Sequence, residues 1–183
     1  RNNATFTNNS GSVLVASTTA QTLSGTMTTA TANTSGFNNL NLYESGVKVF
    51  IDNATTTGTL TFDATSGAVT GPTYLSVASA FDNRSVSFTL PSSNFFVAAN
   101  FTLSGTITPG SGTTTFDGSS AQSITGTPVG NAALGNVSFE GAGAKSFTGA
   151  YASTSNFIID STSGAVSAPS GLLYISGNYV NNS

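Results

Sequence analysis

Short runs of alternating or β-branched apolar residues, each bounded by Gly, Asn, Ser or Thr, recur along the whole chain. This pattern is typical of β-strands of four or five residues. The runs cover residues 12–16, 40–43, 47–51, 59–62, 74–77, 86–90, 101–103, 113–116, 137–139, 156–159 and 172–175. Strong helix formers are scarce, since the chain has one Met, two Gln and two Glu. We therefore predict an all-β protein with no helix longer than one turn.

Short strands separated by polar turns fit two architectures. One is a parallel β-solenoid (β-helix), in which coils stack and inward positions form ladders of similar side chains. The other is a pair of tandem β-sandwich (Ig-like) domains. Asp117-Gly118 is the only Asn-Gly or Asp-Gly pair, although such hairpin signals are common in sandwiches. We therefore favour the parallel β-solenoid and keep the tandem sandwich as the alternative.

The chain repeats itself with an offset of about 100 residues, as expected of stacked units. The matching segments are 20–25 (AQTLSG) with 121–126 (AQSITG), 37–42 (FNNLNL) with 134–139 (LGNVSF), 63–72 (DATSGAVTGP) with 160–169 (DSTSGAVSAP), and 81–85 (FDNRS) with 179–183 (YVNNS). Lys48 and Lys145 also match. We predict one solenoid over residues 1–183, with copies at about 11–85 and 112–183 joined by the unmatched residues 86–111.

The two ends of the chain resemble each other. Residues 5–11 (TFTNNSG) are similar to residues 179–183 (YVNNS), and a stacked repeat leaves a face that a neighbour or cap must cover. The chain begins at Arg1 without an apolar signal core, so we expect a processed or excised segment. We predict that a like molecule meets these ends, with Phe6 and Tyr179 at the junctions.

Composition excludes several classes of function. Only 6% of the residues are charged, with four Lys and Arg, seven Asp and Glu, no His and a net charge of −3. This leaves no basic surface for nucleic acid. The apolar runs are far shorter than the roughly 20 residues of a membrane span. The chain has no Cys, which removes disulfides and zinc–thiolate sites.

Candidate catalytic residues are too few and too scattered to predict an enzyme, a metal site or a cofactor. Asp63 and Asp160 occupy the same position in the two copies. Since Asp accepts backbone N–H bonds in turns, we expect these two carboxylates to stabilise turns. No spacing among the other acidic residues suggests a pair for acid–base hydrolysis.

The matching lysines, Lys48 and Lys145, allow two interpretations. Each copy pairs one Lys with one Asp, so a buried Lys close to a carboxylate or Asn would form an intramolecular amide cross-link. The interpretation that we favour is a Lys on an exposed strand edge, where its charge prevents unwanted strand pairing.

Surface modification and ligand binding are open predictions. Asn-x-Ser/Thr sequons, which suit a glycosylated surface protein, begin at Asn3, Asn8, Asn33, Asn53, Asn83, Asn100, Asn136 and Asn181. Thr-x-Thr triplets, such as those at 5–7, 26–28, 59–61, 106–108 and 113–115, suggest an ice-binding grid, but their spacing along the chain is irregular. Glycan platforms are weakly indicated, because the chain has no Trp and its Tyr residues fit strand positions.

A family resemblance accompanies these repeats. Residues 115–126 (TFDGSSAQSITG), an Asn-rich segment of the type at 37–42 and a closing Asn-Asn-Ser segment resemble the repeats of bacterial secreted and cell-surface β-helix proteins of the adhesin or autotransporter-passenger kind. This resemblance implies a right-handed parallel β-helix outside the cell with a structural or adhesive role.

The resemblance and the repeats together suggest a function. We expect an extracellular or cell-surface structural protein that forms a fibre with copies of itself, head to tail, through exposed strand edges. The alternative is a monomeric adhesin module that binds a surface glycan or ice.

Overall fold

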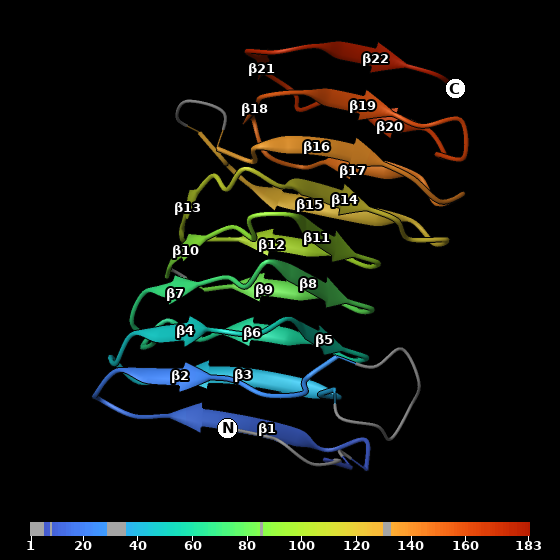
Figure 1. Ribbon diagram of the computed structural model, residues 1–183. Helices are drawn as coiled ribbons and strands as arrows, with labels where there is room; N and C mark the ends of the chain where they lie inside the picture. Colours follow the sequence, from blue (N-terminus) through green and yellow to red (C-terminus); the bar gives the residue numbers. More distant parts are fainter. Residues whose placement is uncertain (1–5, 8, 29–35, 85, 130–132) are drawn as a thin grey trace.

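The computed structural model describes residues 6–7, 9–28, 36–84, 86–129 and 133–183. These residues contain strands and turns but no helix, so none of them forms an apolar helix of membrane-spanning length. The strands wind into a parallel β-solenoid of about seven turns, with the first strands (blue) at one end and the last strands (red) at the other (Figure 1). The predicted all-β solenoid is therefore confirmed, and the tandem sandwich is wrong, because β-sandwiches are built from antiparallel sheets.

Four parallel sheets make up the walls of the solenoid. One sheet of eight strands contains β1 (Ser12–Ala16), β3 (Asn39–Tyr43), β6 (Leu60–Phe62), β9 (Phe81–Asn83), β12 (Phe101–Leu103), β15 (Gln122–Gly126), β17 (Lys145–Phe147) and β20 (Val166–Ser167). A sheet of seven strands contains β5 (Ala54–Thr56), β8 (Tyr74–Val77), β11 (Asn94–Val97), β14 (Thr113–Phe116), β16 (Asn136–Phe139), β19 (Phe157–Ile159) and β22 (Tyr179–Asn181). A sheet of five strands contains β2 (Gln21–Leu23), β4 (Lys48–Phe50), β7 (Val69–Thr70), β10 (Ser87–Thr89) and β13 (Thr106–Thr108), and a sheet of two strands contains β18 (Tyr151–Thr154) and β21 (Leu172–Ile175).

Alternation of inward and outward residues along many of the strands builds the core. In β6 the inward residues Leu60 and Phe62 are fully buried, whereas Thr61 between them is only half-buried. In-register pairing stacks inward residues of successive coils, so that Leu60 lies on Phe81 and Phe81 lies on Phe101. The rings of Phe81 and Phe101 stack with their centroids 5.1 Å apart. These columns of large apolar side chains replace the single core of a globular domain.

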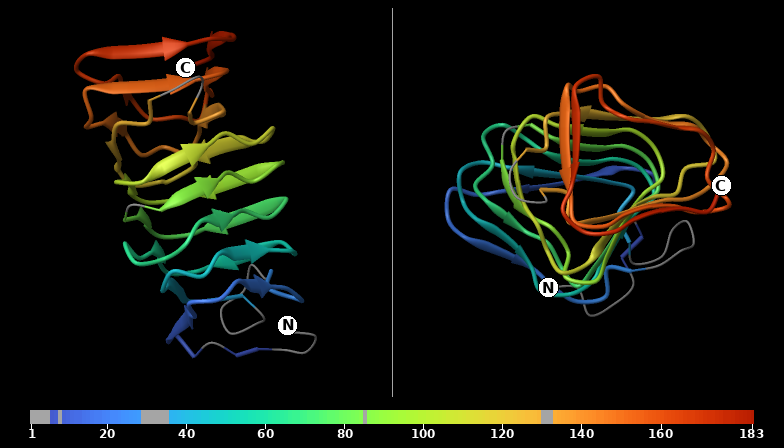
Figure 2. Two further views of the ribbon diagram at one scale, coloured as in Figure 1. Left: turned by 90° about the vertical axis from the view of Figure 1, so that its left-hand side faces the viewer. Right: turned by 90° about the horizontal axis from the view of Figure 1, so that it is seen from above.

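The second copy of the internal repeat is rotated about the solenoid axis relative to the first, so that matching strands lie in different walls. The first-copy strands β3 and β6 lie in the eight-stranded sheet, but their counterparts β16 and β19 lie in the seven-stranded sheet. The first and last coils consequently project to different sides when the molecule is viewed along its axis (Figure 2, right). Residues 86–111, which have no counterpart in the second copy, form β10 to β13 within the same continuous stack.

Asparagine side chains hold successive coils together at the turns. The Oδ1 atoms of four such residues accept the backbone N–H of a residue one coil further along, at distances of 2.8–2.9 Å. The pairs are Asn39 with Thr59, Asn53 with Tyr74, Asn100 with Ser123, and Asn156 with Asn178. These bonds satisfy N–H groups at turns, where the sheet ladders do not reach.

Candidate functional site

Two matching Gln–Lys stacks are the most distinctive polar features of the interior. In the first stack, Gln21 of β2 pairs with Lys48 of β4, and Lys48 pairs with Val69 of β7. In the second stack, Gln122, Lys145 and Val166 pair in the same order on β15, β17 and β20. Both Lys side chains are completely buried. The interior of a β-solenoid is normally apolar, so the contacts of these side chains need explanation.

Each Lys ammonium is enclosed by three backbone carbonyls. The Nζ atom of Lys145 donates to the carbonyl oxygens of Gly118, Gly141 and Gly143, at 2.9, 2.8 and 2.6 Å. The Nζ atom of Lys48 donates in the same way to the matching carbonyls of Ser17, Glu44 and Gly46. An ammonium has three donors, so both groups are saturated. Two acceptors come from the turn before the Lys and one from the coil below, which ties the two coils together.

Burial dominates the electrostatics of the two lysines. Removal from water lowers the pKa of Lys48 and of Lys145, and the opposing attraction of Glu44 or Asp117 is smaller. Burial also raises the pKa of Asp117, and the negative charge of Glu140 contributes in the same direction. The Oδ1 atom of Asp117 is buried and has no hydrogen-bond partner among the described residues.

The structure corrects the prediction for Lys48 and Lys145. Neither residue lies on an exposed edge, because both are buried and each has a neighbouring strand on either side. The alternative amide cross-link gains no support from these contacts, since each ammonium is bonded to carbonyls. Among the described residues, the one ion pair within 4 Å joins Arg84 and Asp82.

The two glutamines, Gln21 and Gln122, occupy matching positions of the repeat but differ in their side-chain hydrogen bonds. The Oε1 atom of Gln122 accepts the Gly118 N–H at 2.8 Å, and its Nε2 donates to the carbonyls of Val97 and Ala99 at 2.8 and 2.7 Å. The Oε1 atom of Gln21 is buried without a partner among the described residues. The coil below β15 supplies the Val97 and Ala99 carbonyls, whereas β2 lies at the end of its sheet.

Asp63 and Asp160 stabilise turns, as the sequence analysis predicted. The Oδ1 atom of Asp63 accepts the Thr65 N–H and hydroxyl at 3.0 and 2.9 Å. Asp160 bonds Thr162 in the same way, with both distances 2.9 Å. These bonds favour the carboxylate form, and the backbone bond is the main cause of the lowered pKa of each Asp.

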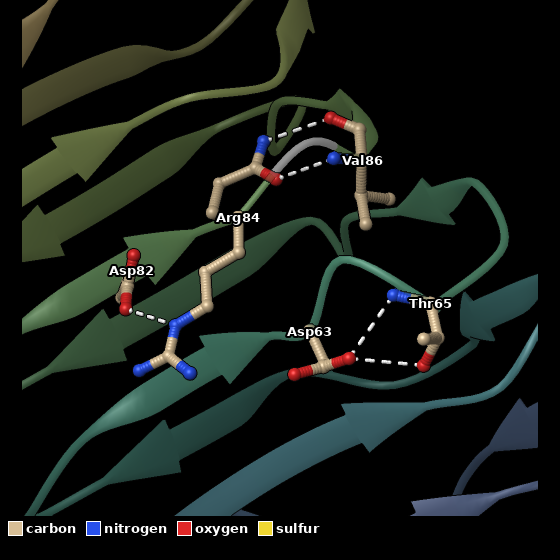
Figure 3. Close-up of polar contacts among 6 residues, drawn as sticks. Asp63, Thr65, Asp82, Arg84 and Val86 are labelled. Carbon is tan, nitrogen blue, oxygen red and sulfur yellow. Dashed lines mark hydrogen bonds and ion pairs between the residues drawn. The ribbon is translucent and has the colours of Figure 1, made fainter.

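A small charged cluster lies on the outer surface near Asp63 (Figure 3). The Nε atom of Arg84 donates to Oδ2 of Asp82 at 2.6 Å, and the Arg84 side chain is half-exposed. Attraction to the Arg84 charge makes a smaller contribution to the lowered pKa of Asp63. Among the described residues, no three His, Cys, Asp or Glu side chains are placed to hold a metal ion.

The predicted sequons differ in accessibility. Asn53, Asn100 and Asn181 are exposed and Asn136 is half-buried, while Asn3, Asn8 and Asn33 lie outside the described residues. The prediction for Asn83 is wrong, because this side chain is fully buried. Its amide bonds the N–H and the carbonyl of Val86 at 3.0 and 2.9 Å (Figure 3), so a glycan has no room there.

A row of residues, most of them Thr, runs along the outer face of the five-stranded sheet. Its members are irregularly spaced along the chain, so the sequence does not predict it. Pairing between strands aligns Thr22, Val49, Thr70, Thr89 and Thr108, one residue per coil. Turns of different length absorb the irregular spacing along the chain, so the row is continuous in space. Successive residues of the row repeat at the strand spacing of about 4.8 Å, and Val49 interrupts the hydroxyls between Thr22 and Thr70.

The last coil, β20 to β22, leaves several apolar residues partly exposed. Its inward residues Val166, Leu173 and Ile175 are half-buried, and Tyr179 is 58% exposed. The Tyr179 ring stacks on Phe157 with centroids 5.9 Å apart, but nothing covers its other side among the described residues. Phe6, the second predicted junction residue, is 38% exposed, and its ring centroid lies 6.2 Å from that of Phe37.

The comparable first-copy coil is fully covered. In β7, β8 and β9, the inward residues Val69, Leu75, Val77 and Phe81 are buried to within 1%. The coil above covers them, with Phe88 over Val69, Phe95 over Leu75 and Phe101 over Phe81. The last coil therefore presents inward apolar residues like those of an interior coil, and no described coil lies above it.

Comparison with known proteins adds no further identification. No protein-family model, no curated protein and no solved structure matches the chain. The candidate functional features are therefore the Gln–Lys stacks and the exposed last coil, as the geometry presents them.

Proposed function

We propose that the chain is a structural segment of an extracellular or cell-surface fibre, in which solenoids stack end to end through their parallel strand edges. The exposed last coil is the observation that carries this proposal. Its strands β20, β21 and β22 each end a sheet, so backbone N–H and C=O groups on one side of each strand have no sheet partner. A further coil would pair with those groups and cover Tyr179.

The charge distribution supports close stacking of such segments. The two buried lysines take no part in the surface, and Arg84 is paired with Asp82. The net charge of −3 is spread over 183 residues, so repulsion between neighbouring molecules is weak. Burial of the apolar residues of the last coil would contribute roughly 25 cal/mol for each Å² removed from water.

Sedimentation velocity and electron microscopy of the full chain test the proposal. The wild-type protein should form elongated oligomers as the concentration increases. Tyr179→Lys should remain folded, because this side chain is already mostly exposed, and should stay monomeric, because it places a charge in the junction. Tyr43→Lys is the matched control, since Tyr43 is also exposed but lies on the side of the solenoid. A wild-type protein that remains monomeric at its highest soluble concentration would contradict the proposal.

The threonine-bearing row supports ice binding as a second candidate function. An ice-recrystallisation assay tests it, with Thr70→Lys and Thr89→Lys as the variants. Wild-type activity that both substitutions abolish would support this candidate, and an inactive wild-type protein would exclude it.

A further inference from the structure

Two sequons of the chain place an exposed asparagine directly before a strand. Asn53 precedes β5 and Asn100 precedes β12, and the first residue of each strand, Ala54 or Phe101, is fully buried. Because successive residues of an extended chain point to opposite faces, each Asn points outwards. These two sites therefore meet the first requirement of N-linked glycosylation, which is an Asn-x-Ser/Thr acceptor at the surface.

The oxygen and the nitrogen of each side-chain amide have different surroundings. Oδ1 of Asn53 accepts the backbone N–H of Tyr74 at 2.9 Å, and Oδ1 of Asn100 accepts that of Ser123 at the same distance. Neither Nδ2 atom has a hydrogen-bond partner within the described part of the chain. Oδ1 and Nδ2 lie on opposite sides of a planar carboxamide, so the bond that orients Oδ1 towards the next coil turns Nδ2 away from it.

The sequons at Asn136 and Asn83 lack this arrangement. Asn136 is half-buried; its Nδ2 donates to the carbonyl of Gly112 at 3.3 Å, and its Oδ1 accepts Nδ2 of Asn156 at 2.9 Å. Nδ2 of the buried Asn83 donates to the carbonyl of Val86 at 2.9 Å. In both residues the nitrogen faces other protein groups, so an attached glycan would displace its neighbours.

We infer that Asn53 and Asn100 are attachment sites for an N-linked glycan, and that Asn83 and Asn136 are not. In the reaction, Nδ2 attacks the anomeric carbon of an activated sugar, such as a nucleoside-diphosphate sugar. The new C–N bond replaces the bond from that carbon to a phosphate oxygen, Nδ2 loses one proton, and the nucleoside diphosphate leaves. The product keeps Oδ1 as an acceptor, so the bond to the next coil survives. This inference goes beyond the proposed fibre role and does not depend on association between copies.

The surface next to Asn53 has room for the first sugar. An open hollow of about 380 Å³ is lined by Gly25, Thr26, Thr28, Asp52 and Asn53. Oδ2 of Asp52 accepts the N–H of Gly25 at 2.7 Å, which orients the carboxylate in the wall of the hollow. Threonine hydroxyls and a carboxylate provide donors and acceptors for the hydroxyl groups of a sugar.

Glycosylation of the folded full chain in vitro tests the inference. A soluble N-glycosyltransferase transfers glucose from UDP-glucose to Asn-x-Ser/Thr, and peptide mass spectrometry locates the added hexose. Each rate is divided by the rate for a synthetic peptide of the same sequon, which removes the preference of the enzyme for particular sequences. The ratio should be at least about tenfold lower at Asn83 and Asn136 than at Asn53 and Asn100, because modification of the first two requires local opening. A ratio at Asn53 or Asn100 no higher than that at Asn136 would overturn the inference.

Two variants at one site separate attachment from the bond between coils. Asn100→Asp keeps an oxygen that accepts the Ser123 N–H but has no Nδ2, and Thr102→Val keeps the amide but removes the hydroxyl of the sequon. Both should keep a thermal midpoint within about 4 °C of the wild type and lose modification at Asn100, while Asn53 is still modified. The glycosylated wild type should keep its midpoint within the same range. A larger decrease on glycosylation would show that Nδ2 contributes to the fold, and would overturn the inference.

Discussion

Lys48 and Lys145 occupy matching positions of the internal repeat but lie in different sheets of the solenoid, on β4 and β17 respectively. Each nevertheless meets the same three carbonyl positions and the same Gln neighbour in the coil below. The ammonium cage therefore depends on the turn that precedes the Lys and on one adjacent coil. It does not depend on the wall of the solenoid in which it is placed.

Lys145→Met should lower the free energy of unfolding by about 3 kcal/mol, because it keeps the aliphatic volume but leaves three buried carbonyls without their donor. Urea denaturation followed by circular dichroism measures the change. Arg84→Met is the control and should have little effect, since the Arg84–Asp82 pair is on the surface. Equal stability of the Lys145→Met and wild-type proteins would show that the cage does not stabilise the coils.

Lysine acylation provides a second measurement of the same cages. Because both lysines are fully buried, a water-soluble amine acylating reagent should leave Lys48 and Lys145 unmodified in the folded protein. The same reagent should modify both after denaturation in urea. Peptide mass spectrometry reads the outcome, and rapid labelling of either residue in the folded protein would contradict the buried cage.

Gly143→Ala should destabilise the protein by about 3 kcal/mol, since a Cβ atom at this position would lie 1.9 Å from the backbone oxygen of Ser120. The clash is with backbone of the coil below, so no side-chain rotation relieves it. Thermal unfolding measures the effect. Ala144→Ser, at the exposed neighbouring position, is the control and should be close to neutral.

Stability should be nearly constant between pH 7 and pH 5 and should fall below about pH 4. The lowered pKa values of Asp63 and Asp160 mean that the folded state binds fewer protons than the unfolded state. Their stabilisation is therefore present above the unfolded pKa and is lost as the pH falls through the folded pKa. The raised pKa of Asp117 acts in the opposite direction, so protonation of Asp117 offsets a part of this loss.

Thermal midpoints across this pH range check the prediction. The double variant Asp63→Asn and Asp160→Asn keeps an acceptor oxygen in each turn but removes the titration, so its midpoint should depend less on pH below pH 4. An acid dependence equal to that of the wild type would assign the effect to other groups.

Several strands could be predicted to the residue from the sequence. The runs at 12–16, 74–77, 101–103, 113–116 and 172–175 coincide with β1, β8, β12, β14 and β21. In β8 and β12, the buried apolar residues alternate with the small polar residues Ser76 and Thr102, which is the period of a strand with one buried face. In contrast, β2, β15 and β17 were not predicted, because their inward positions include Gln21, Gln122 and Lys145. A pattern of apolar residues cannot identify an inward amide or ammonium.

The β character, the parallel solenoid and the duplication follow from the sequence, because strand propensity, turn residues and repeated motifs are local properties. Three other features could not be predicted from the sequence. They are the burial of Lys48 and Lys145, the unpaired Oε1 of Gln21 and the displacement of the second copy by one wall. They depend on which residues about 20 positions apart become neighbours in adjacent coils, and the turn lengths that set this register leave no periodic signal along the chain.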